Sequence, residues 1–154
     1  MMLYLLALLI GIIAGLRAMT APAAICWAAY LGWIDLTGTP LAWMGYQWTP
    51  WIFTLLAIGE LITDQLPKTP SRKVPPQFIA RILLGGLSGA AIGASNGLLT
   101  GGAIAGVIGA VIGTLGGAAG RSKLAKGFAS DRPAAIIEDI IAIGGAFLIV
   151  SALA

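Results

Sequence analysis

The chain has 154 residues, of which 58% are hydrophobic and 10% are charged, and its mean hydropathy is +0.95. So few polar residues cannot cover the surface of a soluble domain, and the composition therefore predicts an integral membrane protein. The net charge of +3 comes from basic residues in short loops beside apolar segments. This placement indicates retention of those loops in the cytoplasm and argues against nucleic-acid binding.

Six apolar segments of roughly bilayer-crossing length follow one another, and we expect each to form a transmembrane helix of a single domain, residues 1–154. Their approximate ranges are 2–17, 20–34, 50–66, 77–97, 99–120 and 133–153. The first lacks a basic leading region, so we interpret it as a spanning segment and not as a cleaved signal peptide. Only Arg17 to Pro22 separates the first two, which form either a hairpin or one interrupted helix pair. The predicted fold class is an all-α integral membrane protein, a compact bundle of about six transmembrane helices.

Basic residues predict the orientation of this bundle. Outside the helices they gather in loops 67–76 and 121–132, which lie on the same side if six helices cross the bilayer. The positive-inside rule makes that side cytoplasmic and places both termini outside. The opposite side carries Asp35 and several tryptophans and tyrosines in and around residues 35–49, the composition of an interfacial aromatic belt.

Glycine recurs every four residues in the fourth and fifth segments. The rows are Gly85, Gly89, Gly93 and Gly97, then Gly109, Gly113 and Gly117, with Gly102 and Gly106 on a neighbouring row. Small residues at this spacing form a groove on one helix face, and two helices can then approach closely. We expect a glycine-zipper helical hairpin, and such a groove on an outer face would also suit a homodimer. A phosphate-binding loop is disfavoured because such loops connect a strand to a helix.

Six ionisable residues fall inside apolar segments, close to the predicted cytoplasmic side. They are Arg17, Glu60, Asp64, Arg81, Glu138 and Asp139. A charge in a membrane segment costs a few kcal/mol, so such residues usually face the bundle interior and either pair or form a site. Four acids against two arginines leave a formal surplus of two negative charges, which favours a cation, proton or metal site, or a carboxyl group that stays protonated. The alternative is an ion-pair network that only holds the helices together.

Three stretches of the chain resemble the DUF4126 family of small bacterial membrane proteins. They are Gly15-Leu16-Arg17-Ala18-Met19-Thr20-Ala21-Pro22-Ala23, Gly59-Glu60-Leu61-Ile62-Thr63-Asp64-Gln65-Leu66-Pro67, and Ala80-Arg81 followed by a glycine-rich helix. The resemblance covers most of the chain and implies a location in the bacterial inner membrane. It singles out Arg17, Glu60, Asp64 and Arg81 without supplying a reaction.

These features favour a transporter or channel for a small solute, cation or proton, with the four acids as its site and the two arginines setting its charge. A membrane enzyme or carrier acting on lipid phosphates is the first alternative, and a structural membrane subunit is the second. Enzymatic activity is disfavoured because the chain has no histidine and no phosphotransfer motif. With a single cysteine, Cys26, we expect no intrachain disulfide and no cofactor.

Overall fold

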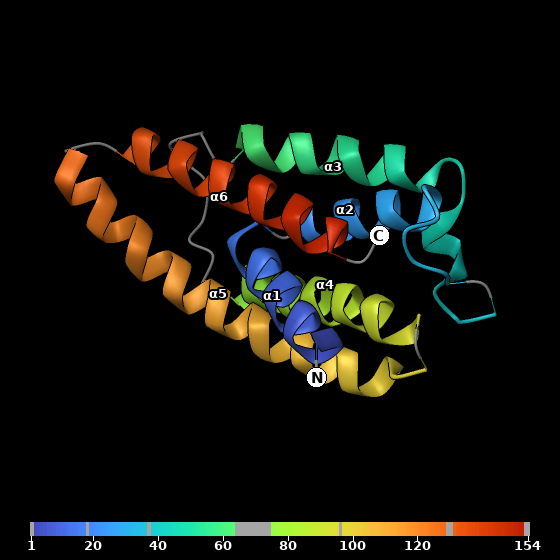
Figure 1. The fold of residues 1–154 in the computed structure, drawn as a ribbon. Coiled ribbons are helices and arrows are strands. Elements are labelled where there is room, and N and C mark those ends of the chain that lie inside the picture. The colour runs from blue at the N-terminus through green and yellow to red at the C-terminus, as the bar shows by residue number, and fades with distance from the viewer. Residues whose placement is uncertain are drawn as a thin grey trace.

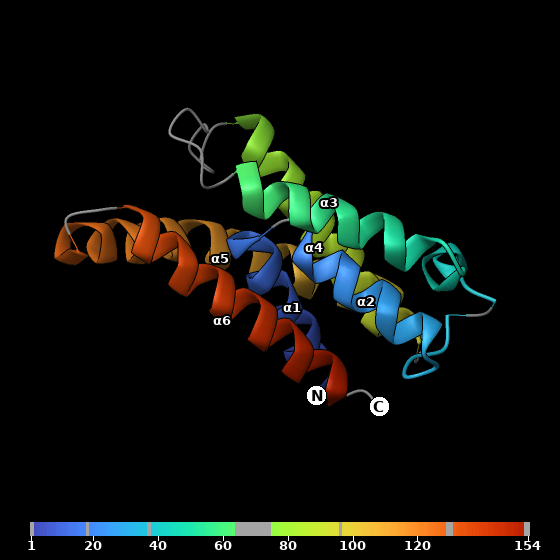
Figure 2. The ribbon, with the colours of Figure 1, turned by 90° about the horizontal axis from the view of Figure 1, so that it is seen from above.

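Six α-helices make up the part of the chain that the computed structural model describes, residues 2–17, 19–36, 38–63, 75–95, 97–128 and 131–152. The predicted all-α fold is therefore confirmed. In chain order the helices are α1 (Met2–Leu16), α2 (Thr20–Tyr30), α3 (Thr49–Thr63), α4 (Pro75–Ala94), α5 (Leu99–Phe128) and α6 (Asp131–Ser151), and the short 3-10 helix η1 (Ala42–Gly45) precedes α3. α1 and α2 are separate helices that meet at an angle (Figures 1 and 2).

Two helices end earlier than the sequence predicts, and a glycine follows each end. α2 stops at Tyr30 and not at residue 34, and Gly32, two residues later, has a φ of 83°. α4 stops at Ala94 and not at residue 97, and Gly97 has a φ of 73°. Glycine takes this left-handed conformation without a Cβ clash, so that the backbone can turn back and satisfy the last carbonyls of the helix.

α5 is longer than predicted, with 30 residues and a length of about 45 Å. The prediction of a loop over residues 121–132 is wrong for most of that range, because α5 continues to Phe128 and α6 begins at Asp131. Arginine, lysine, leucine and alanine in this stretch are good helix formers, and no proline occurs before Pro133. The C-terminal part of α5 extends past α1 and α4 in both views (Figures 1 and 2). The other predicted loop, 67–76, lies outside the described residues up to residue 74.

α1, α4 and α5 form a close-packed unit, which we call the glycine core. α4 and α5 meet through two glycine rows, and a Cβ at Gly89 or at Gly102 would lie less than 3.0 Å from the backbone of the opposite helix. The predicted pairing of the fourth and fifth segments is therefore present. Gly109 and Gly113 lie instead against the backbone of α1 near Ile12, a contact that the sequence did not predict. Most of these glycines therefore lie in contacts between helices of the same chain.

α2 and α6 pack against this core, and α3 lies against α2; we call these three the outer helices. α3 packs against α2 and η1, where Trp27 Nε1 donates to Thr54 Oγ1 at 2.7 Å and the rings of Trp27 and Trp51 meet edge to face. Their outward faces carry large apolar side chains, and Leu55 and Leu148 are each 69% exposed. By length and composition, the segment Leu99–Gly117 of α5 could cross a membrane, and among the described residues Met2–Leu16 and Phe78–Ala94 form shorter apolar helices.

We predict that Gly89→Ala destabilises the protein, because its Cβ would enter the backbone of α5. Overpacking of roughly 3 kcal/mol should lower the melting temperature in detergent by about 10 °C. Gly144→Ala is the matched control, since nothing lies within 4 Å of a Cβ at this helical position. It should leave the melting temperature unchanged or raise it slightly. Equal melting temperatures for the two variants would contradict the close contact between α4 and α5.

Candidate functional site: charges at the break between α1 and α2

The site is built around the short break between the first two helices. α1 ends at Leu16 and α2 begins at Thr20. The last carbonyl groups of a helix and the first N–H groups of the next one have no partner within their own helices, and they carry opposite partial charges. The break therefore places a negative helix end and a positive helix end within a few residues of each other.

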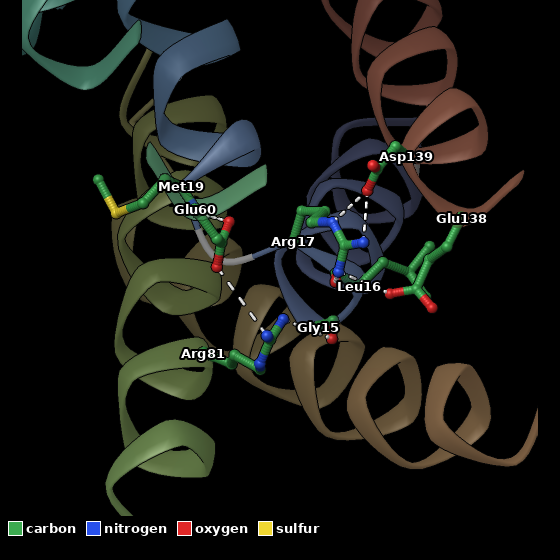
Figure 3. A network of polar contacts seen from close by, with 8 residues as sticks. All are labelled: Gly15, Leu16, Arg17, Met19, Glu60, Arg81, Glu138 and Asp139. Carbon is green, nitrogen blue, oxygen red and sulfur yellow. Dashed lines mark hydrogen bonds and ion pairs between the residues drawn. The ribbon is translucent and has the colours of Figure 1, made fainter. Parts of the chain in front are cut away.

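Arg17 occupies the break and is fully buried, with 0% exposure. Its Nη1 donates to Glu138 Oε1 at 3.1 Å and to the Leu16 carbonyl at 3.3 Å. Its Nε and Nη2 both contact Asp139 Oδ1 (Figure 3). One arginine thus joins the end of α1 to two adjacent carboxylates of α6.

Arg81 of α4 lies on the other side of the break and is 2% exposed. Its Nη1 donates to the Gly15 carbonyl at 3.1 Å, and its Nη2 lies 3.9 Å from Glu60 Oε2. Glu60 of α3 also accepts the Met19 backbone N–H at 3.1 Å through Oε1 (Figure 3). This second group joins α4, α3 and both sides of the break.

The charges match the helix ends that they touch. Arg17 and Arg81 donate to carbonyl groups at the C-terminus of α1, where partial negative charge accumulates. Glu60 accepts from the start of α2, where partial positive charge accumulates. Arginine suits this task because its guanidinium group donates in several directions and stays charged when buried. The break therefore needs both signs of charge beside it.

Five of the six predicted site residues come together at this level of the bundle, and Asp64 lies outside the described residues. Glu60 pairs with Arg81, whereas Glu138 and Asp139 pair with Arg17. Figure 3 shows Glu60 on the opposite side of Arg17 from the two acids of α6. Within the described residues, no three acidic, histidine or cysteine side chains are close enough to hold one metal ion.

Sequence reasoning missed the backbone partners in this site: the Gly15 and Leu16 carbonyls and the Met19 N–H. A signal for them exists in the sequence. A break between two apolar helices leaves backbone groups exposed, and these groups attract charges of the matching sign. When the sequence places arginines and a glutamate at the same level of the bundle as such a break, we can therefore expect them to bind the helix ends as well as each other.

The chain belongs to the family described as Domain of unknown function (DUF4126), whose model matches residues 4–152. The predicted family membership is therefore confirmed. Neither a curated protein nor a solved structure matches the chain.

We predict that Arg17→Met strongly destabilises the protein, because the change removes the guanidinium group from the buried Glu138 and the half-buried Asp139. Breaking a buried ion pair in this way costs about 3–5 kcal/mol. Lys123→Met is the control, since Lys123 is an exposed basic residue of α5. Thermal unfolding in detergent should separate the two variants, and a wild-type melting temperature for Arg17→Met would show that the ion pairs contribute little.

Proposed function

We propose that this chain is a multi-pass protein of the bacterial inner membrane that transports a small solute, cation or proton, with the arginine–carboxylate pairs as its gate on the cytoplasmic side. The observation that carries the proposal is the way these pairs connect the helices. Each arginine belongs to the glycine core or to its edge, and each joins that core to a different outer helix, α6 or α3. We call the five residues the charge network: Arg17, Glu60, Arg81, Glu138 and Asp139.

Insertion into a bilayer is supported by the outer surface of the molecule. Contiguous apolar faces of this extent are rare on soluble monomers, whereas the exposed leucines and isoleucines of α3 and α6 would suit contact with lipid. Exposed aromatic residues gather before and at the start of α3, at the end of the bundle away from the charge network. These are Tyr30, Trp43, Tyr46, Trp48 and Trp51. Tryptophan and tyrosine prefer the membrane interface because they have both apolar rings and polar groups.

Movement of the outer helices relative to the core is supported by their packing. Within the glycine core the helix backbones touch, and small residues in such contacts leave little freedom to shift. α3 packs on α2 and η1 and reaches the core mainly through Glu60. A break in the pair between Glu60 and Arg81 would therefore release one end of α3 from α4.

The chemistry of such a gate follows from the carboxylates. A proton or a cation that binds the Glu60 carboxylate weakens its attraction for Arg81 and for the Met19 N–H. The same event at Glu138 or Asp139 weakens the attachment of α6 to Arg17. Binding of a proton or a cation to these carboxylates would thus be coupled to the positions of α3 and α6. Ion-driven transport requires such a coupling.

A structural role is the second candidate, and the pairing within the charge network favours it. Both arginines contact carboxylates, as expected if the network only joins helices. Against this role, a buried ion pair seldom stabilises a fold more than well-packed apolar residues would. The carrier of lipid phosphates has less support, because Arg81, which would meet the phosphate, is buried and already bound to a carbonyl group.

The proposed orientation predicts that position 46 faces the outside and that position 123 faces the cytoplasm. Both side chains are exposed, so cysteines placed there should react readily. In intact cells that carry Cys26→Ala, a membrane-impermeant maleimide should label Tyr46→Cys and should label Lys123→Cys only after lysis. The reverse pattern would show that the topology is inverted. Labelling of both positions in intact cells would contradict the proposal that the chain between positions 46 and 123 crosses the membrane to the other side.

We further predict that Glu60→Gln abolishes transport while preserving the fold. In proteoliposomes, the wild type should dissipate a gradient of protons or of at least one ion from a panel of Na⁺, K⁺, NH₄⁺ and Mg²⁺, and Glu60→Gln should not. Asp131→Asn removes the same charge at the start of α6 and serves as control. Two results together would establish the structural role: no flux by the wild type, and partial recovery of the melting temperature of Glu60→Gln when Arg81→Met is added.

A further inference from the structure

An apolar groove runs along α2 between α3 and α6. It has a volume of about 390 Å³, within the range of small-ligand sites. α3 and α6 both pack against α2, which lies between them in both overall views (Figures 1 and 2). The small side chains of Ala23 and Ala24 line the groove on α2, and larger ones line it on the neighbouring helices, among them Ile58 of α3 and Phe147 of α6. α2 thus forms the floor of the groove, and α3 and α6 form its walls.

The groove opens sideways on the apolar surface of the bundle. Ile58 and Ile143 lie on opposite walls and are each 49% exposed, and Phe147 is 61% exposed. The proposed insertion into a bilayer places this surface against lipid. A lipid chain can therefore enter the groove from the side without crossing water.

The polar groups on the walls are already used within the protein. Trp27 Nε1 donates to Thr54 Oγ1 at 2.7 Å, and Thr54 Oγ1 donates to the Pro50 carbonyl at 2.7 Å. Most of the remaining lining is alanine, isoleucine, leucine, phenylalanine and valine. Water is a poor occupant of such a space because it needs two to four polar partners, and an empty space would forfeit dispersion contacts. The lining therefore favours an apolar occupant.

The size of the groove fits a single hydrocarbon chain better than a partner helix. Thr20 and Leu31 line its two ends on α2, and the chain rises about 16 Å between them. The hydrocarbon core of a bilayer is about 30 Å thick, so one leaflet contributes about 15 Å. A helix of the same length would occupy roughly 1,200 Å³, about three times the volume of the groove.

The two ends of the groove differ, and this difference orients the chain. At one end, Thr20 follows Met19, whose backbone N–H binds Glu60 of the charge network. At the other end lies Trp33, close in the sequence to the exposed Tyr30. Tryptophan and tyrosine prefer the interface, where lipid headgroups lie. The headgroup therefore belongs at the Trp33 end, and the methyl end of the chain points toward the charge network.

We infer that one acyl chain of a phospholipid from the outer leaflet lies in this groove. The inference rests on the proposed insertion and orientation in the membrane, and it adds a ligand to the proposed function. A chain in this position lies between α3 and α6, the two helices that the gate would release.

Photolabelling in proteoliposomes of phosphatidylethanolamine and phosphatidylglycerol tests the inference. The probe is a phosphatidylethanolamine with a photoreactive diazirine near the methyl end of one acyl chain. After illumination, mass spectrometry of peptides should find the label on α2 near Ala24 as well as on the exposed faces of α3 and α6. Ala57→Phe fills the groove from its wall on α3 and should lower the labelling of α2 about fivefold. Leu55→Phe is the matched control, because this side chain lies on the same helix, is 69% exposed and is outside the lining.

Ile143→Trp fills the groove from the opposite wall and should lower the labelling of α2 in the same way. Melting temperatures show which variants are folded. Unchanged labelling of α2 in both folded variants would overturn the inference, and so would loss of this label on addition of excess palmitate but not of excess phospholipid, since the occupant would then be a free fatty acid. Label on α3 and α6 without label on α2 would overturn it while leaving the insertion in place. Absence of label from all three helices would overturn the insertion as well.

Discussion

The structure depends on how two opposed helix ends are satisfied inside an apolar bundle. α1 ends and α2 begins within a few residues, where little water can reach the unpaired backbone groups. Arg17 and Arg81 supply donors to the carbonyl groups, and Glu60 supplies an acceptor for the Met19 N–H. Each of these charges then needs an opposite charge, and this requirement draws α3, α4 and α6 to the same level.

The glycine core gives this break a fixed reference. α5 contacts α4 through one row of glycines and α1 through another, so the three backbones approach more closely than larger side chains would permit. These contacts hold the C-terminus of α1 close to α4, the helix that carries Arg81. Outside the glycine core, α3 and α6 carry large apolar side chains on their exposed faces.

The two ends of the bundle differ in the residues that they carry. The charge network balances arginines against acids, with three described carboxylates for two guanidinium groups. The opposite end carries exposed aromatic side chains instead, among them Trp43, Trp48 and Trp51. Charged groups are thus concentrated where the break between α1 and α2 leaves backbone groups without helical partners.

The sequence by itself determined the all-helical class, the family, the rows of close-packing glycines and the residues that carry buried charge. These features follow from composition and from spacing along one helix, which are local properties. The partners were decided only by the tertiary structure. Glu60 pairs with Arg81 and Glu138 with Arg17, and Gly109 and Gly113 contact α1 instead of α4. The angle at the break and the order in which helices pack determine these pairings, and neither quantity is encoded in the period of any single segment.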